Sequence, residues 1–287
     1  MLNLESRLEP IVCYAIEIPA NGLDPEVEER WLANLYSDAE RAKILAKRNR
    51  VDRARSLLGH QLLRHALDIF VRDHSDALEN ELSNAVLNSS DIFTRTEHGK
   101  LIFADAMLTK FPLLSRIAFN ISHAGKWAVA ALALGDGVHI GVDVVRDSLE
   151  EHSLHSCDQL SREMSSQLSQ SEWDLVQVGG SSEQQLTTFH ALWSLKEALV
   201  KAHGTGITRD LHYISFIPQH CEILNNNLDQ LNPPSMCLMD GKMLENAHFS
   251  VQHFDQQDYI VSIALIGSTA KMSDSTIKRV EMEDLKH

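Results

Sequence analysis

The chain has 287 residues, of which 44% are hydrophobic and 23% charged, and its formal net charge is −14. This length suits one large domain or two domains of roughly 140 residues each. The negative charge argues against nucleic acid as the main partner. The longest apolar run, residues 127–134, is far too short for a membrane-spanning helix of about 20 residues, so we expect no membrane partner.

Cysteine usage and the first residues favour a cytoplasmic protein. The cysteines Cys13, Cys157, Cys221 and Cys237 form no C-x-x-C pair, so neither a zinc knuckle nor a redox motif is indicated. Reduced thiols are then the expected state. The opening stretch MLNLESRLEP is acidic early and lacks the apolar core of a signal peptide.

The first third of the chain is predicted to be helical. Residues 24–48 indicate one or two helices with a break at Ser37, whose capping-box partner is Glu40. Leucines at spacings of three and four predict a stronger helix over residues 51–73. Residues 74–100 are polar and include a loop at TEHGK.

A basic island lies within this helical third of an acidic chain. It contains seven cations and a single acid, Asp52. Such a cluster indicates a local anionic ligand, and the simpler alternative is a solvated helix face. The cations are Arg41, Lys43, Lys47, Arg48, Arg50, Arg53 and Arg55.

Strands and one long helix are predicted for the middle of the chain. Residues 116–122 and 127–134 predict two strands joined by the turn HAGK, and residues 138–145 predict a third. Residues 147–190 favour short surface helices and loops. Residues 183–204 predict a long helix, and the glycine that ends this range is placed to cap it.

The last third is predicted as strands, and one hairpin pattern occurs twice. From Phe119 and again from Phe249, a histidine follows four residues later, then a turn and an apolar strand. This repeat predicts an α+β pseudo-dimer of two similar α/β halves with antiparallel sheets, long helices and an active site in the cleft between the halves. The predicted parts are an N-terminal half (1–136), a C-terminal half (137–267) and a polar tail (268–287).

Two carboxylates and a lysine on separate predicted elements suit a magnesium site. Asp143 interrupts an apolar strand, and a buried carboxylate is costly unless it is paired or binds a metal. Glu197 and Lys201 share a helix face, with Lys196 about 100° round the helix from Glu197. Mg²⁺ typically takes one or two carboxylates together with waters and substrate phosphates. The simpler alternatives are a strand end at Asp143 and a surface salt bridge on the helix.

Ser122 and His123 lie at a predicted strand end beside a turn. Neighbouring strand residues point to opposite faces, so the two do not form a nucleophile–base pair. A histidine beside a tight turn suits a phosphate ligand, although a single histidine is more often structural. The sequence has no P-loop, Rossmann fingerprint or H-E-x-x-H motif.

Five stretches, in chain order, resemble the 4′-phosphopantetheinyl transferase superfamily, in its long, surfactin-synthetase-activating (Sfp) type. DRARSLLGHQLLR (52–64) resembles the family's N-terminal helix motif, and EHGK (97–100) resembles its G-K-P loop. FNISH (119–123) is similar to its substrate-loop motif, and IGVDVV (140–145) to its G-[VI]-D strand. WSLKEALVKAHGTGI (193–207) matches its W-x-x-K-E-[AS]-x-x-K-x-x-G-x-G-[LI] signature almost position for position.

The resemblance implies an enzyme of the holo-[acyl-carrier-protein] synthase type. Such enzymes transfer the 4′-phosphopantetheine arm of coenzyme A to a serine hydroxyl of an apo acyl or peptidyl carrier protein and release 3′,5′-ADP. Coenzyme A is the implied co-substrate, Mg²⁺ the implied metal and a monomer the implied state. The carrier would serve fatty-acid, polyketide or nonribosomal-peptide biosynthesis, among other pathways.

The resemblance also implies residue roles. Asp143 and Glu197 are the implied metal ligands, and Asp143, Glu197 and Lys201 the catalytic residues. Glu197 would also accept the serine proton, directly or through a water, and Lys201 would hold a phosphate oxygen. We expect the charged helix edge, Lys196 included, to face the cleft. The implied coenzyme-binding residues are Lys43, Arg55, Lys100, Ser122, His123 and Lys201.

Leu101 stands where the family's G-K-P loop usually has proline. Two further positions depart from the family pattern and leave other functions open. Many bacterial members carry a third acidic ligand where this chain has Val145, and others carry Gln where it has Ala124. A water could take that place, since Mg²⁺ readily keeps water. One alternative is a catalytically weak or silent relative that binds coenzyme A or a carrier protein without transfer. Another is a nucleic-acid binder that uses residues 41–55, against which the net charge argues.

Overall fold

The computed structural model describes residues 11–35, 37–74, 78, 92–149, 157–178, 180–204, 206, 211–217, 236–267 and 276–285. The chain divides into two compact units. The N-terminal unit comprises residues 9–138 and 275–287, and the C-terminal unit comprises residues 1–8 and 139–274. The predicted polar segment after residue 74 and both ends of the chain lie partly outside the described residues.

The N-terminal unit is built on a four-stranded sheet in the order β12-β1-β5-β4. Strand β4 (Ile117–Ala124) and strand β5 (Trp127–Leu134) form the predicted hairpin, and Ala124 pairs with Trp127 across a two-residue turn. Gly125 occupies this turn with φ of 51°, a conformation that glycine adopts without strain. Strand β1 (Ile11–Glu17) pairs antiparallel with β5, which is buried along its whole length.

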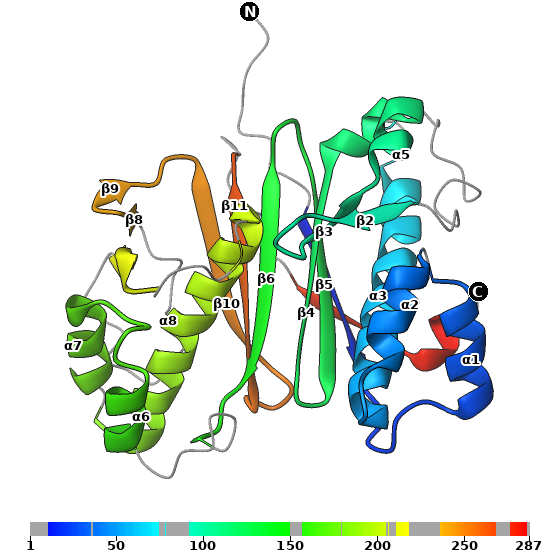
Figure 1. Ribbon diagram of the computed structural model, residues 1–287. Helices are drawn as coiled ribbons and strands as arrows, with labels where there is room; N and C mark the ends of the chain where they lie inside the picture. Colours follow the sequence, from blue (N-terminus) through cyan, green and yellow to red (C-terminus); the bar gives the residue numbers. More distant parts are fainter. Residues whose placement is uncertain are drawn as a thin grey trace, which may run out of the picture. The chain divides into compact units, whose positions relative to one another are not determined.

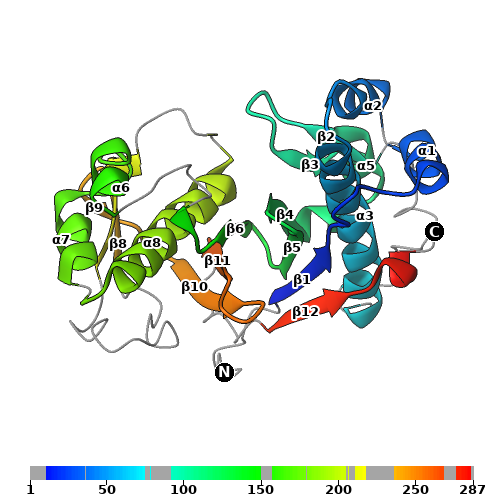
Figure 2. The same cartoon turned by 90° about the horizontal axis from the view of Figure 1, so that it is seen from below.

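One long helix covers this sheet, as Figures 1 and 2 show. Helix α3 (Arg50–Asp73) contacts β5, β1 and β4 through the predicted leucine face. Helices α1 (Pro25–Ala33) and α2 (Asp38–Leu45) pack on α3. The predicted break between them is confirmed, because the Ser37 hydroxyl accepts the Glu40 N–H at 3.1 Å and caps α2.

Short elements link α3 to the hairpin. Strands β2 (Phe93–Arg95) and β3 (Leu101–Phe103) form a small antiparallel pair around the predicted TEHGK loop. Helix α5 (Asp105–Lys110) and the 3₁₀ turn η1 (Pro112–Arg116) follow and lead into β4. The aromatic rings of Phe93 and Phe103 stack, and both meet Phe119 edge to face, at centroid distances of 4.9 to 5.8 Å. These contacts hold the small pair against β4.

Part of the segment predicted as a polar tail is ordered in the N-terminal unit. Strand β12 (Ile277–Val280) pairs parallel with β1, and the 3₁₀ turn η6 (Met282–Leu285) follows it. Lys278 lies 5.7 Å from the ring centroid of Tyr14, and Arg279 lies 4.9 Å from that of Trp127. These cations cover aromatic rings, which explains why a strand of such polar composition resembles a solvated tail in the sequence.

The C-terminal unit is built on a three-stranded antiparallel sheet in the order β10-β11-β6. Strand β6 (His139–Arg146) pairs with β11 (Tyr259–Ile266), which pairs with β10 (Ala247–Phe254). Helix α8 (Ser182–His203) lies across this sheet and contacts all three strands. Gly204 ends α8 with φ of 74°, which confirms the predicted cap.

Smaller elements of the C-terminal unit pack beyond α8. Helices α6 (Cys157–Glu163) and α7 (Gln170–Val178) contact α8 on the side away from the sheet (Figure 2). The 3₁₀ turn η3 (Leu211–Tyr213) leads into a small sheet of β7 (Ile214–Ile217), β8 (Met236–Met239) and β9 (Lys242–Met243). Those strands pair in the order β7-β8-β9.

The protein is therefore α+β with mainly antiparallel sheets, as predicted. Each unit has the same chain order of strand, long helix and hairpin, which is β1-α3-β4-β5 in one and β6-α8-β10-β11 in the other. In both sheets the second strand of the hairpin lies between the first strand of the hairpin and the strand that precedes the long helix. The pseudo-dimer and its cleft stay predictions. None of the described helices has the length and hydropathy to cross a membrane.

Candidate active site

One face of β6 lies against helix α8. Alternate strand residues share a face, so Gly141, Asp143 and Val145 point the same way, and Asp147 continues the row just after the strand. A Cβ atom at Gly141 would lie 1.9 Å from the Ala198 carbonyl oxygen. Only glycine lets the strand and the helix approach this closely.

The facing side of α8 carries polar side chains at spacings of three and four, a pattern that places them on one helix face. We call this set the polar stripe. One end of the stripe contacts Asp143 of β6, and the other end contacts Asp147, the residue that follows β6. At its centre the Ser194 and Ser262 hydroxyls lie 2.5 Å apart. Ser262 on β11 pairs directly with Asp143 on β6. The stripe consists of Thr187, His190, Ser194, Glu197 and Lys201.

Asp143, Glu197 and Lys201, predicted from separate elements, lie together. Asp143 and Glu197 are buried, and Lys201 Nζ donates to Asp143 Oδ1 at 2.6 Å. Burial first and then the charge of Asp143 raise the pKa of Glu197 to about 7, while Lys201 acts in the opposite direction. A carboxyl group with such a pKa can take up or release a proton near neutral pH.

These two carboxylates fit a Mg²⁺ ion. Both offer hard oxygens, and the charge of Asp143 disfavours a second bare carboxylate beside it, a conflict that a divalent cation relieves. Val145, at the position of the family's third acid, is 1% exposed and belongs to the apolar core of the C-terminal unit. Within the described ranges no three His, Cys, Asp or Glu side chains form a metal-binding group.

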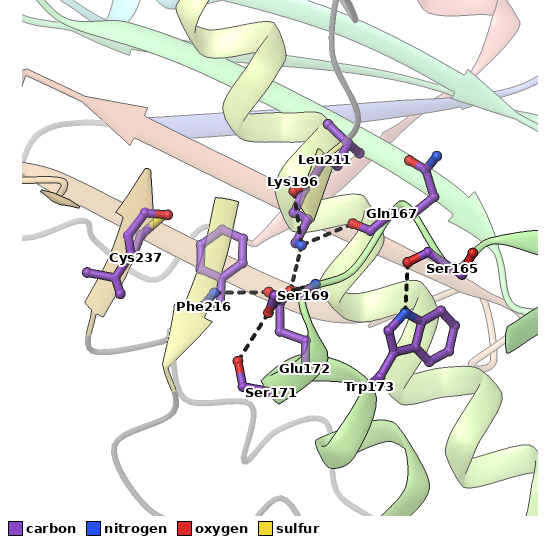
Figure 3. A network of polar contacts seen from close by, with 11 residues as sticks. Ser165, Gln167, Ser169, Ser171, Glu172, Trp173, Lys196, Leu211, Phe216 and Cys237 are labelled. Carbon is purple, nitrogen blue, oxygen red and sulfur yellow. Dashed lines mark hydrogen bonds and ion pairs between the residues drawn. The ribbon is translucent and has the colours of Figure 1, made fainter. Parts of the chain in front are cut away.

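Lys196 does not belong to this charged edge, contrary to the sequence-based expectation. It is fully buried, and its ammonium group lies 2.5 Å from Glu172 Oε2. It also donates to the Gln167 and Leu211 carbonyls at 3.0 and 3.2 Å (Figure 3). Because Lys196 lies one residue before Glu197, it leaves the polar stripe and points into the core.

Glu172 is the buried partner that the sequence analysis missed when it assigned α7 to the surface. Its carboxylate accepts from the Ser169 N–H and hydroxyl at 2.8 Å each and from the Phe216 N–H at 3.0 Å (Figure 3). The network therefore ties α8 to the start of α7 and to β7. The capping-box spacing from Ser169 to Glu172 was the signal that could have revealed it.

The other five predicted residues belong to the N-terminal unit. Ser122 is buried and His123 exposed on β4, as strand alternation requires. Lys43 is exposed on α2, without a hydrogen bond or ion pair to any residue that the structure describes. Burial lowers the pKa of Lys100 to about 8. Arg55 pairs with Asp52 at 2.6 Å and donates to the Gly125 carbonyl at 3.0 Å, which fixes α3 to the hairpin turn.

The turn that carries Lys100 is anchored by a buried charge network. Arg95 on β2 binds both oxygens of Glu40, at 2.5 and 2.8 Å, and donates to the Gly99 carbonyl at 2.6 Å. His60 Nε2 lies 3.2 Å from the same carboxylate. Burial acts to raise the pKa of Glu40, but the hydrogen bonds from His60 and Arg95 outweigh burial and hold it well below its usual range.

Much of the basic island has structural roles. In addition to Arg55, three arginines of the island bind neighbouring elements. Arg41 donates to the Leu32 carbonyl and Arg50 donates to the Leu23 carbonyl, each at 2.9 Å. Arg53 pairs with Glu28 at 2.6 Å. These contacts give four arginines of the island structural roles, whereas Lys43, Lys47 and Arg48 make none of these contacts. An anionic ligand at the island stays a prediction.

Comparison with known proteins supports the class that the site indicates. Residues 139–264, which contain Asp143, Glu197 and Lys201, match the model of the 4′-phosphopantetheinyl transferase superfamily. This match confirms the resemblance to that superfamily and lies within the C-terminal unit.

Similar curated proteins carry corresponding names. L-aminoadipate-semialdehyde dehydrogenase-phosphopantetheinyl transferase of Mus musculus is 26% identical over 67% of this chain and 62% of its own length. A phosphopantetheinyl transferase of Thraustochytrium sp. is 28% identical over 79% of this chain and 68% of its own. The 4′-phosphopantetheinyl transferase Sfp of Bacillus subtilis is 28% identical over 67% of this chain and 70% of its own length. The chain thus spans less than two thirds of the length of the mouse relative.

Proposed function

We propose that the protein transfers the 4′-phosphopantetheine arm of coenzyme A to a serine hydroxyl of an apo carrier protein and releases 3′,5′-ADP, with Mg²⁺ as the metal. The observation that carries this proposal is the cluster of Asp143, Glu197 and Lys201 inside the part of the chain that matches the superfamily. Acyl and peptidyl carrier proteins are the proposed acceptors. The name of the mouse relative adds an aminoadipate-semialdehyde dehydrogenase as another acceptor to test.

Each residue of the cluster has a chemical role in this reaction. The serine oxygen forms a bond to the phosphorus that carries pantetheine, the P–O bond to 3′,5′-ADP breaks, and the serine proton passes to Glu197 directly or through a water. Lys201 donates to a phosphate oxygen. Asp143 and Glu197 would hold Mg²⁺, which supplies positive charge against the charge that develops on the pyrophosphate.

The N-terminal unit would bind the coenzyme. We assign its 3′-phosphate to Lys43 and His123, with Ser122, Arg55 and Lys100 as further contacts. Lys100 keeps a proton less firmly than an ordinary lysine because of its burial, and a phosphate partner would reverse that effect. A pseudo-dimeric arrangement, a cleft between the halves, a monomeric state and a cytoplasmic location complete the proposal.

A second candidate function rests on Val145. A catalytically weak or silent relative would bind coenzyme A or a carrier without transfer, and the apolar burial of Val145 removes the third acidic ligand. The intact carboxylate pair and Lys201 favour the active enzyme, since a silent relative has no need to keep a buried carboxylate pair that is costly without a cation.

The direct test is the intact mass of an apo carrier protein after incubation with the protein, coenzyme A and Mg²⁺, with and without EDTA. We expect a gain of one phosphopantetheine group that EDTA abolishes. A fatty-acid carrier and a peptidyl carrier are tested in parallel. If neither carrier gains mass but calorimetry detects coenzyme A binding, the silent relative is correct. If coenzyme A does not bind either, both candidate functions are wrong.

Lys43→Ala is expected to weaken binding of coenzyme A about tenfold, the effect of one lost charge-assisted hydrogen bond, and to leave 3′-dephospho-coenzyme A almost unaffected. Calorimetric dissociation constants for both ligands measure this difference. Arg30→Ala is the matched control, because Arg30 is an exposed cation of the same unit that lies outside the basic island. Equal weakening of both ligands by Lys43→Ala would remove Lys43 from the 3′-phosphate site.

A further inference from the structure

A second buried polar cluster joins β6 to α8, outside the motifs of the superfamily resemblance. Asp147, the first residue after β6, accepts from the Thr187 hydroxyl at 2.5 Å through Oδ2. Its Oδ1 lies 2.7 Å from Nδ1 of His190. A carboxylate can only accept, so His190 carries a proton on Nδ1. We call these three residues the Asp147 cluster.

Burial makes the Asp147 cluster energetically demanding. The His190 side chain has no exposed surface, and that of Asp147 is 8% exposed. Removing such a group from water is costly unless its hydrogen bonds are made, and a buried pair of this kind often adds little net stability compared with apolar residues. Buried polar pairs are better attested as devices that fix one register between two elements. A positional role therefore fits this cluster.

The backbone of Asp147 is also fixed. Its N–H donates to the Asp258 carbonyl at 2.8 Å, in the loop between β10 and β11. The carboxylate is thus held from the sheet side before it meets α8. Thr187 and His190 lie three residues apart, so both reach the same carboxylate from a single helix face.

The Asp147 cluster and the carboxylate site are two links between the same strand and the same helix. Asp147 follows Asp143 by four residues, about 13 Å along an extended chain. Glu197 follows His190 by seven residues, which is about two helix turns and about 10 Å. Both helix residues belong to the polar stripe. A slip or rotation of α8 on β6 would therefore break the cluster and separate Glu197 from Asp143 together.

We infer that Thr187, Asp147 and His190 are positioning residues that fix α8 on β6 in the register that brings Glu197 next to Asp143. This inference rests on the proposed function, since the site that it positions is the proposed Mg²⁺ site. The inference gives a role to Asp147, the second carboxylate, after Asp143, in the row on this face of β6. Position 145 contributes a core valine, and the acid two residues further on binds the helix.

Asp147→Ala tests the inference, with two measurements on the folded full chain. Calorimetry with MgCl₂ is expected to show about tenfold weaker binding, the lower end of the effect of removing groups that orient metal ligands. Hydrogen exchange without metal is expected to show about tenfold faster exchange of the backbone amides of residues 197–201, the effect of losing hydrogen bonds to a charged group. Asp147→Asn should restore both values to within about threefold, because an amide can still bond Thr187 and His190.

Two adjacent threonines supply a matched control. Thr187 and Thr188 lie side by side on α8, and each hydroxyl donates one hydrogen bond, Thr187 to Asp147 and Thr188 to the Gln184 carbonyl of its own helix at 2.8 Å. Thr187→Val is expected to speed exchange at 197–201 and to weaken Mg²⁺ binding, both severalfold. Thr188→Val should leave both values unchanged.

The outcomes separate this inference from the proposed function. If the wild-type chain binds no Mg²⁺, the proposed metal site fails, and hydrogen exchange alone decides the positioning role. Exchange at 197–201 that is unchanged in Asp147→Ala, or changed equally by Thr187→Val and Thr188→Val, overturns the inference. So does Mg²⁺ binding that is unchanged in Asp147→Ala when the wild-type chain binds the ion.

Discussion

Asp143→Asn and Glu197→Gln are each expected to lower the rate of phosphopantetheine transfer about 10³-fold, close to complete loss. Each substitution keeps the shape of the side chain and removes one of the two charges that would hold Mg²⁺. Removing a single group that stabilises developing charge costs 10²- to 10³-fold in other enzymes, and Glu197 would lose its role as a base as well. Single-turnover transfer to an apo carrier, measured with saturating coenzyme A, gives the rate.

Stability separates a lost reaction from a lost fold. Burial and Asp143 raise the pKa of Glu197 from about 4.5 to about 7, so the native state keeps a proton that the unfolded chain releases. The contribution of this group to the free energy of unfolding is therefore full below about pH 4.5 and is lost as the pH rises through about 7. Without metal, Glu197→Gln should be more stable than the wild type at pH 8, by up to about 3 kcal/mol, and equally stable at pH 4.

Glu183→Gln is the control for this prediction. Glu183 lies in the exposed first turn of the same helix, so its substitution should leave the rate of transfer unchanged. Guanidinium titrations at the two pH values measure stability. Near-normal transfer by Glu197→Gln or Asp143→Asn would show that the metal site has been assigned to the wrong residues.

The sequence predicted the elements of the site because local signals and tertiary structure agree there. The leucine spacing of α3, the apolar hairpin and the glycine that caps α8 all matched the structure to within one or two residues. Asp143 stood out because a charge inside an apolar strand needs a partner. Glu197 and Lys201 followed from helix periodicity, since residues four apart share a face.

The partners of the remaining charges could not be predicted, because they lie far apart in the sequence. Lys196 looks like a site residue beside Glu197, but its partner Glu172 lies on α7, 24 residues earlier. Arg53 similarly meets Glu28 from another helix, 25 residues away. Periodicity shows on which face of its own helix or strand a residue lies. Which other helix or strand packs against that face depends on the tertiary structure.

The sequence-based prediction included only Glu197 and Lys201 of the polar stripe of α8. The stripe's spacings of three, four, three and four residues predict one continuous polar face on the helix. The family signature contains Glu197 and Lys201, whereas Thr187 and His190 lie two to three turns earlier, outside it. A polar row on a buried helix requires a matching polar row on its neighbour, which Asp143 and Asp147 provide.

Gly141→Ala is expected to lower the free energy of unfolding by about 3 kcal/mol, at the upper end of the effects of overpacking. The new Cβ would lie 1.9 Å from the Ala198 carbonyl oxygen and 2.5 Å from the Ala202 nitrogen, both backbone atoms of α8. No side-chain rotation relieves such contacts, so the helix must move away from β6. Chemical denaturation monitored by circular dichroism measures the loss.

Gly59→Ala is the control with the opposite sign. Gly59 lies inside α3, and a Cβ there would meet only the Ile121 Cδ1 atom, at an ordinary 3.7 Å. Alanine stabilises a helix interior by up to about 1 kcal/mol relative to glycine, so this variant should be as stable as the wild type or more stable. The contrast isolates the clash at position 141 from the general effect of replacing glycine.

The Gly141 variant also links the fold to the proposed chemistry. Ala198 and Ala202 directly follow Glu197 and Lys201, so a helix displaced at these alanines carries both site residues away from Asp143. We therefore expect Mg²⁺ binding to weaken in Gly141→Ala under conditions where the variant is still folded. Full Mg²⁺ affinity together with the loss of stability would show that the site tolerates displacement of α8. The glycine of the G-[VI]-D pattern would then serve packing alone.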